Sequence, residues 1–302
     1  MTNIHRSGFV NIIGRPNVGK STLLNALVGE RMSIITNKPQ TTRHRIIGIL
    51  SGEDFQLVFS DTPGIIRQPS YKMHEAMNRF AHSTFDDADL MLLVTEPAEK
   101  YDAEDPVLKR LANVEAPKLL IINKVDTVPQ ERVEELIANW QKVATFDHIV
   151  PISALNKTNT DVLLQRIVES LPEGPAYYPK DQLTDRPERF FVSEIIREKI
   201  FLNYEQEIPY SCEVVVTDFK DSETNAGLPL ARINAVIFVS RESQKPILLG
   251  RGGSAMKKLA TEARKDIEVF LARKAFLEIH IKVRDNWRDD ERVLKHFGYT
   301  GS

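Results

Sequence analysis

The stretch GRPNVGKS, residues 14–21, constrains the fold of this chain more than any other feature. It fits the pattern G-x-x-x-x-G-K-S, follows an apolar run at Phe9–Ile13 and precedes a run with helical spacing at 20–28. A glycine-rich turn between a buried strand and a helix exposes backbone N–H groups at the helix N-terminus, where phosphate groups bind. The sequence therefore predicts a nucleotide site in which Lys20 reaches the β- and γ-phosphates and Ser21 ligates Mg²⁺.

Strand-like and helix-like patterns alternate through the first 172 residues. Strands are expected at Phe9–Ile13, Ile46–Leu50, Gln56–Asp61, Leu90–Thr95, Lys118–Asn123 and Ile149–Ser153. Helices are expected at 20–28, 71–84, 104–113, 130–145 and 159–171. Several of these strands are nearly continuous apolar runs, which is typical of strands buried on both faces of a sheet. The alternation predicts an α/β domain over residues 1–172, with a mostly parallel sheet between helices.

The motif DTPG, residues 61–64, ends another expected strand. Asp61 would hold Mg²⁺ through a water molecule, and the Gly64 N–H would contact the γ-phosphate. Loops at the carboxyl ends of the strands of an open α/β sheet meet in one ligand crevice. DTPG is therefore expected to lie beside the same phosphate groups as the first glycine loop.

The motif NKVD, residues 123–126, points to the base of the nucleotide. Asp126 can accept two hydrogen bonds from the N1–H and the exocyclic amine of guanine, and adenine lacks this pair of donors. Asn123 would support the base edge, and the stem of Lys124 would cover the base plane. After the last expected strand, a backbone N–H in SAL, residues 153–155, would meet the guanine O6. The sequence therefore predicts a guanine nucleotide.

These motifs together resemble the Ras-like GTPase superfamily. The stretch at 14–22, TTR at residues 41–43 and DTPG together resemble its bacterial translation-factor-related branch. The resemblance implies that Thr42 is the switch residue that contacts Mg²⁺ and the γ-phosphate, with Thr41 as the alternative. Ile65 stands where Ras-type enzymes have a glutamine that positions water, which implies slow intrinsic hydrolysis. Asn17 resembles the asparagine by which some relatives bind K⁺ beside the phosphates; its alternative is a simple loop residue.

The predicted site has three overlapping sets of residues. The nucleotide-binding set is Gly14, Arg15, Pro16, Asn17, Val18, Gly19, Lys20, Ser21, Thr22, Asp61, Thr62, Pro63, Gly64, Asn123, Lys124, Asp126, Ser153, Ala154 and Leu155. The set expected to act in hydrolysis is Lys20, Thr42, Asp61 and Gly64, and the Mg²⁺ set is Ser21, Thr42 and Asp61. A different class, an ATP-using kinase or ATPase, would share the phosphate loop, and NKVD is the motif that separates the two.

The second part of the chain reads as a smaller α+β domain. A proline-rich stretch, residues 173–190, is expected to be a linker, and residues 191–302 to be the second domain with a short C-terminal helix. Strands are expected at about 211–218, 230–239 and 276–284, and helices at 190–204, 254–272 and 287–296. The run Pro246–Leu249 is too short to assign to a strand or a helix.

A second glycine loop, GRGG at residues 250–253, precedes the long helix of this second domain. From Arg241 to Arg284 there are 11 Lys and Arg residues against 5 Asp and Glu, although the whole chain has a formal net charge of −2. A basic segment in an acidic chain indicates a polyanionic partner. The order of elements and the G-x-x-G loop resemble a KH domain of type II, whose loop clamps single-stranded RNA. The simpler alternative is a helix-capping turn with a solvated basic face.

The resemblance to a KH domain implies a set of RNA contacts. Those residues are Gly250, Arg251, Gly252, Gly253, Lys257 and Lys258. Gly252 is an extra glycine where many KH loops have a basic residue, and it is expected to loosen the loop.

The combination of these domains with SEIIREKI, residues 193–200, resembles the Era family of ribosome-assembly GTPases. The resemblance implies binding and hydrolysis of GTP, binding of 16S rRNA near its 3′ end, a role in maturation of the small ribosomal subunit, and peripheral association with the inner membrane. The alternative is a nucleotide-stabilised RNA chaperone in which hydrolysis is incidental. No signal peptide or membrane span is recognisable, and the only cysteine is Cys212, so a cytoplasmic location is expected. The chain is also expected to be a monomer.

Overall fold

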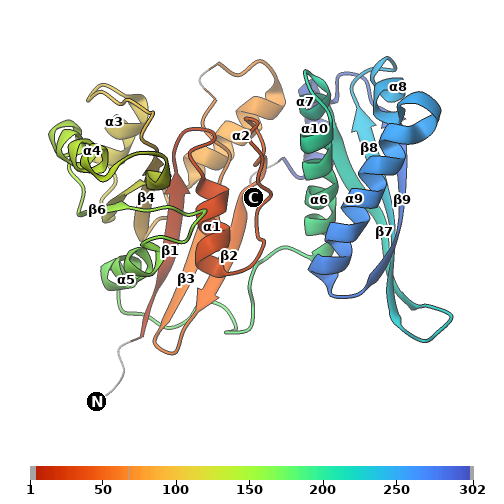
Figure 1. Cartoon of the computed structure of the whole chain (residues 1–302). Coiled ribbons are helices and arrows are strands. Elements are labelled where there is room, and N and C mark those ends of the chain that lie inside the picture. The colour runs from red at the N-terminus through yellow and green to blue at the C-terminus, as the bar shows by residue number, and fades with distance from the viewer. Residues whose placement is uncertain (1–4, 67, 300–302) are drawn as a thin grey trace. The chain divides into compact units, whose positions relative to one another are not determined.

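The computed structural model describes residues 5–66 and 68–299 and divides into two compact units (Figure 1). The second unit comprises residues 34–41, 68–76 and 186–299, and the first comprises the other described residues. Two short segments from the N-terminal half of the chain therefore belong structurally to the C-terminal unit. The boundaries expected from the sequence, residues 1–172, 173–190 and 191–302, did not assign these two segments to the second unit.

The first unit is built on a sheet of six strands among the described residues, in the order β2-β3-β1-β4-β5-β6. The strands are β1 (Arg6–Ile13), β2 (Ile46–Ser51), β3 (Phe55–Asp61), β4 (Leu90–Thr95), β5 (Lys118–Ile122) and β6 (His148–Pro151). β2 pairs antiparallel with β3, and every other neighbouring pair is parallel. The predicted mostly parallel sheet is confirmed, and its strands end at the loops that carry the predicted nucleotide motifs.

Helices cover both faces of this sheet (Figure 1). They are α1 (Lys20–Val28), α2 (Lys72–Ser83), α3 (Pro106–Ala112), α4 (Gln130–Val143) and α5 (Thr160–Ser170). On one face, Leu120 and Ile122 of β5 pack in one buried cluster with Leu108 of α3 and with Leu136 and Trp140 of α4. Burial of apolar side chains on both faces explains why these strands read as continuous apolar runs.

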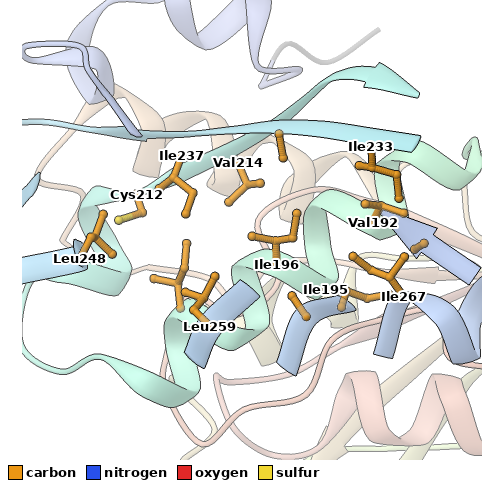
Figure 2. Close-up of a cluster of buried hydrophobic side chains, with 14 of the residues drawn as sticks. Val192, Ile195, Ile196, Cys212, Val214, Ile233, Ile237, Leu248, Leu259 and Ile267 are labelled. Atoms are coloured by element: carbon orange, nitrogen blue, oxygen red, sulfur yellow. The ribbon is translucent and has the colours of Figure 1, made fainter. Parts of the chain in front are cut away.

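The second unit has a three-stranded sheet in the order β7-β8-β9 within the described residues. Its elements are α6 (Glu188–Asn203), α7 (Ile208–Ser211), β7 (Glu213–Glu223), β8 (Pro229–Val239), α8 (Gln244–Leu249), α9 (Ser254–Leu271), β9 (Lys274–Val283) and α10 (Glu291–His296). β7 and β8 are antiparallel, whereas β8 and β9 are parallel. Figure 2 shows the core between sheet and helices, where Ile196 of α6 and Leu259 of α9 meet Ile237 of β8. The predicted α+β domain is confirmed.

Several local predictions differ from the structure. Residues 171–185 are held along the first unit, where Thr184 Oγ1 donates to Ile47 O at 2.7 Å. α6 begins at Glu188, inside the expected linker, directly after Pro187. Proline needs no hydrogen-bond acceptor for its nitrogen, so it suits the position before a helix. The predicted C-terminal helix is divided at Asp290, whose side chain caps the N–H groups of α10. The unassigned run before Gly250 is helical, as α8.

Candidate nucleotide site and candidate RNA-binding loop

The two glycines of the first loop are required by the protein's own packing as well as by a phosphate ligand. A Cβ atom on Gly14 would lie 2.3 Å from the Val94 carbonyl oxygen at the end of β4. A Cβ atom on Gly19 would lie 2.3 Å from Nδ2 of Asn123. Both glycines also have positive φ, a region that other residues rarely adopt. The loop is therefore pressed against the ends of two neighbouring strands.

Lys20, the first residue of α1, is buried beneath this loop. Its Nζ donates to the carbonyl oxygens of Gly14 and Arg15, both at 2.9 Å. Burial lowers the pKa of Lys20, and the nearby carboxylate of Asp61 opposes this shift. A lysine whose ammonium group is held at the start of the loop is oriented before any ligand arrives, so a phosphate group meets a fixed positive charge.

Four oxygen-bearing side chains of the first unit converge beside Lys20. Ser21 Oγ donates to Asp61 Oδ2 at 2.7 Å, and Ser33 Oγ donates to the same oxygen at 2.9 Å. Thr42 Oγ1 lies 3.0 Å from Ser21 Oγ. Among the described residues, Asp61 Oδ1 has no hydrogen-bond partner although it is buried. A carboxylate and hydroxyl oxygens around an unpaired carboxylate oxygen suit a small hard cation such as Mg²⁺.

The environment of Asp61 bears on its charge. Burial raises the pKa of Asp61, while Lys20 and the hydroxyl donors Ser21 and Ser33 lower it. A divalent cation at this place would favour the ionised form still further.

The two candidate switch threonines, Thr41 and Thr42, have different hydrogen-bond partners. Thr41 Oγ1 donates to Lys38 O at 2.6 Å within the second unit. The geometry therefore favours Thr42 over Thr41 as the residue at the cation.

The NKVD loop is joined to its neighbours by the side chain of Asn123. Its Nδ2 donates to Val18 O at 2.8 Å, and its Oδ1 accepts from the Ala154 N–H at 3.0 Å. Asn123 therefore fixes the first glycine loop and the SAL loop to each other, whereas the sequence suggested only support of a base edge. Lys124 Nζ donates to Asn17 O at 2.7 Å, and the Asp126 carboxylate is exposed. A base could lie between these loops with Asp126 at its edge.

Other predicted residues of the glycine loop have defined partners. Arg15 points to the loop before α3, where it pairs with Asp105 at 2.8 Å and stacks over Tyr101. A Cβ on Gly64 would lie 2.8 Å from the ring of Pro16, so the DTPG loop passes directly over the glycine loop. The Asn17 backbone is left-handed, with a φ of 69°, which asparagine tolerates better than most residues. Thr22, Thr62, Pro63, Ser153 and Leu155 lie in the same loops or in the first turn of α1.

Two residues of this site were missed by the sequence reasoning. Ser33 binds Asp61, and it is held in place because Asn25 accepts from its N–H at 2.9 Å. Glu96, which follows β4, forms an ion pair with Lys124. Neither residue lies in a recognisable motif, and no spacing in the sequence marks them.

The second glycine loop has three residues with positive φ, Gly250 at 70°, Gly252 at 59° and Gly253 at 78°. A Cβ on Gly250 would lie 2.7 Å from the Cβ of Ala255, so this glycine lets the loop fold back onto its own helix. No atom lies within 4 Å of a Cβ built on Gly252 or Gly253. The extra glycine therefore occupies a left-handed position that favours glycine, which is a more definite role than the expected loosening.

Basic and apolar side chains surround this loop. Arg251, Lys257 and Lys258 are exposed, and Lys258 lies 3.9 Å from Glu262 one helical turn further on. Ile247 and Leu249 of α8, which the sequence reasoning did not single out, are exposed apolar side chains just before the loop. Exposed apolar groups beside cations are suited to nucleobases beside phosphates.

The described residues contain no cluster of three or more His, Cys, Asp or Glu side chains that could hold a metal ion. No helix that the structure describes is long and apolar enough to cross a membrane.

Two parts of this chain match known protein families. Residues 9–124 match a family described as 50S ribosome-binding GTPase, and residues 207–288 match the KH domain family. The chain is 46% identical to GTPase Era of Syntrophus aciditrophicus over 296 residues, which cover 98% of this chain and 95% of that protein. It is 44% identical to GTPase Era of Clostridium kluyveri over 295 residues, which cover 97% and 99%.

Two solved structures are similar over nearly the whole chain. A tyrosine-to-alanine variant of Aquifex aeolicus Era bound to GDP and aluminium fluoride is 35% identical, with a TM-score of 0.90, and the match covers 98% of this chain and 100% of that one. Era in complex with MgGDPNP and nucleotides 1506–1542 of 16S ribosomal RNA is 35% identical, with a TM-score of 0.91 and the same coverage.

Proposed function

This chain belongs to the Era family of GTPases, and from that premise we propose that it is a nucleotide-controlled switch that binds 16S ribosomal RNA near its 3′ end. It would do so through the Gly250–Gly253 loop, and it would act in assembly of the small ribosomal subunit. The GTPase domain would be residues 1–172, the linker 173–190 and the KH-like domain 191–302. The observation that carries the proposal is the convergence of Ser21, Thr42 and Asp61 in a chain that also has an open KH loop.

The oxygen set at Asp61 fits Mg²⁺, and Ser21, Thr42 and Asp61 would hold it. When bound, Mg²⁺ would neutralise charge on the β- and γ-phosphate oxygens. Lys20 would bind the same phosphates, the Gly64 N–H would contact the γ-phosphate, and Asp126 would select guanine. A low-dielectric, preorganised group of charges stabilises the transition state of phosphoryl transfer, so these residues favour hydrolysis of GTP.

Water at the γ-phosphate must be oriented without a glutamine, because Ile65 follows DTPG. The ring of Pro16 lies close to Gly64, so it leaves little room between the first glycine loop and the DTPG loop. We therefore expect a slow intrinsic rate that a cation or a partner increases. Asn17 is exposed in the glycine loop, and we propose that its side chain binds K⁺ there.

The potassium proposal predicts faster GTP hydrolysis in K⁺ than in Na⁺. An added positive charge that stabilises the transition state by about 1.4 kcal/mol would raise the rate about tenfold. Asn17→Gly removes the side chain while tolerating the positive φ, and it should abolish the difference between the two cations. The measurement is single-turnover hydrolysis in matched chloride buffers. Equal rates in K⁺ and Na⁺ for the unsubstituted protein would show that the potassium proposal is wrong.

The proposed function is tested by RNA affinity in two nucleotide states. A labelled RNA that carries the 3′-terminal region of 16S rRNA would be titrated with protein bound to GDPNP or to GDP, and GTP would be compared with ATP in a separate binding assay. We expect tight binding of GTP over ATP and a clear difference in RNA affinity between the two states. Preference for ATP would favour the kinase or ATPase class.

The chaperone alternative differs in what hydrolysis does. If hydrolysis is incidental, RNA would leave equally fast from complexes with GTP and with GDPNP. If the chain is a switch, release of RNA would follow conversion of GTP to GDP and would be slow with GDPNP.

We further propose that the protein is a cytoplasmic monomer that associates peripherally with the inner membrane. Vesicle sedimentation would test the membrane association, and analytical ultracentrifugation would test the oligomeric state.

A further inference from the structure

Residues 34–41, which lie just before the proposed switch residue Thr42, belong to the second unit. Within this unit, Lys38 Nζ donates to the carbonyl oxygen of Phe201 at 2.6 Å and to that of Tyr204. The backbone N–H of Ile35 donates to Glu198 Oε1 at 3.2 Å. A segment that precedes Thr42 in the sequence is thus bound to the C-terminal part of α6 and to its cap residue.

The last carbonyl groups of a helix have no intrahelical donor and carry the negative end of the helix dipole. Tyr204 is the C-terminal cap residue of α6, and Phe201 lies in its last turn. The ammonium group of Lys38 satisfies both carbonyls and is half-buried, so its charge is less screened than that of a surface lysine. Lys38 therefore binds the negatively polarised C-terminal end of α6.

The side chain of Tyr204 connects the end of α6 with α8, the helix that directly precedes the second glycine loop. Its hydroxyl donates to Leu248 O at 2.7 Å, in a buried hydrogen bond. Burial raises the pKa of Tyr204 to about 12, so the hydroxyl stays protonated and remains a donor. Leu248 lies in α8, two residues before Gly250, and its side chain is fully buried in the core shown in Figure 2.

The segment around Lys38 is a compact turn. Thr41 Oγ1 donates to Lys38 O at 2.6 Å and lies 2.6 Å from Thr36 Oγ1. Thr42 follows Thr41 directly and lies at the proposed Mg²⁺ and γ-phosphate position. A change at Thr42 therefore acts on a turn that internal hydrogen bonds hold together, and Lys38 is the side chain by which this turn binds α6.

The segment after DTPG is attached to the same unit. Lys72 N donates to Asp289 Oδ1 at 3.2 Å, and Lys72 Nζ pairs with Glu291 at 2.9 Å. His74 Nε2 lies 3.2 Å from Gln40 Oε1, which joins the two segments. The Lys72 pair is exposed, and exposed pairs contribute little. The half-buried contact of Lys38 is therefore the stronger candidate for coupling.

We propose that Lys38 is the positioning residue that transmits the nucleotide state to the RNA-binding loop, through the end of α6 and the Tyr204–Leu248 hydrogen bond. This inference rests on the proposed function, because it explains how nucleotide and RNA affinity are linked. A coupling of this kind typically changes affinity by about 5–150-fold.

The test compares RNA affinity in the GDPNP and GDP states for four variants. Lys38→Met removes the ammonium and should bring the ratio of the two dissociation constants close to one. Lys38→Arg retains a cation and should restore part of the ratio. Tyr204→Phe keeps the ring and removes the hydrogen bond to Leu248 O, and it should also reduce the ratio. Lys142→Met is the matched control, because Lys142 is an exposed lysine of α4, and it should leave the ratio unchanged.

The double variant Lys38→Met with Tyr204→Phe should reduce the ratio no further than the stronger single variant, because both act in one path. A normal ratio in Lys38→Met, or equal losses in Lys38→Met and Lys38→Arg, would overturn the inference and leave the proposed function standing. Equal RNA affinity in both nucleotide states for the unsubstituted protein would overturn the proposed function and the inference with it.

Discussion

A Gly253→Asp variant is expected to lose at least about 100-fold in affinity for single-stranded RNA and to bind GTP normally. The φ of Gly253 is 78°, and no atom lies within 4 Å of a Cβ placed there, so an aspartate side chain would project into open space. A negative charge beside an RNA phosphate costs several kcal/mol, which is sufficient for this loss. Aspartate tolerates a positive φ better than most residues, so the fold should survive.

Gly227→Asp is the matched control for this variant. Gly227 lies in the turn between β7 and β8, has a φ of 72° and likewise has no atom within 4 Å of its Cβ position. Both variants therefore add the same charge at a position with similar positive φ and open space, and they differ in their place in the domain. RNA titrations at several salt concentrations would compare them. A clamp on about four phosphates predicts a log–log salt slope of about −3 for the unsubstituted protein and for Gly227→Asp. Full RNA affinity in Gly253→Asp would contradict the KH interpretation.

An Asp126→Asn variant is expected to lose at least about 100-fold in GTP affinity and to prefer xanthine nucleotides. Two hydrogen bonds to a charged acceptor contribute about 1.5–3 kcal/mol each, so losing both of them is sufficient for this loss of GTP affinity. Xanthine has a carbonyl oxygen where guanine has the exocyclic amine, and the amide of asparagine can donate to it. Asp126 is exposed, so the substitution should cost little stability, and a loss of affinity would report recognition of the base.

Asp161→Asn is the control for base recognition, because Asp161 is an exposed aspartate in the first turn of α5. Equilibrium titrations with fluorescent GTP and XTP would measure both proteins. The control should bind GTP as the unsubstituted chain does. If Asp126→Asn also binds GTP normally and shows no gain for XTP, Asp126 does not read the base.

Much of the fold could be predicted from local patterns. The helix expected at 20–28 is α1, and the strand expected at Leu90–Thr95 is β4 with the same bounds. Apolar periodicity and capping residues act within a few positions of each other, so a single sequence carries their signal. The short α8 was not predicted, because six residues provide too little periodicity to separate a helix from a strand.

Residues of the candidate site could be predicted where they lie in a sequence motif. They could not be predicted where only a tertiary contact places them in the site. Asp61 and Ser21 were expected at the cation and lie together. Ser33 was missed, because a serine hydroxyl near a carboxylate has no characteristic spacing in the sequence. Gly14 and Gly19 were expected to bind a phosphate group. Their close approach to Val94 and Asn123 depends on the pairing of the strands, so only the tertiary structure shows it.

The sequence by itself determined the chemistry that we propose for this protein: a loop for phosphates, a carboxylate for guanine and a second glycine loop for RNA. Those roles depend on particular side chains, or on glycine, in short runs with defined neighbours. Only the tertiary structure decided that residues 34–41 and 68–76 belong to the unit that carries the second loop. The partners of Lys38 are the backbone carbonyls of Phe201 and Tyr204. Every residue has such a carbonyl, so no pattern of side chains could have identified them.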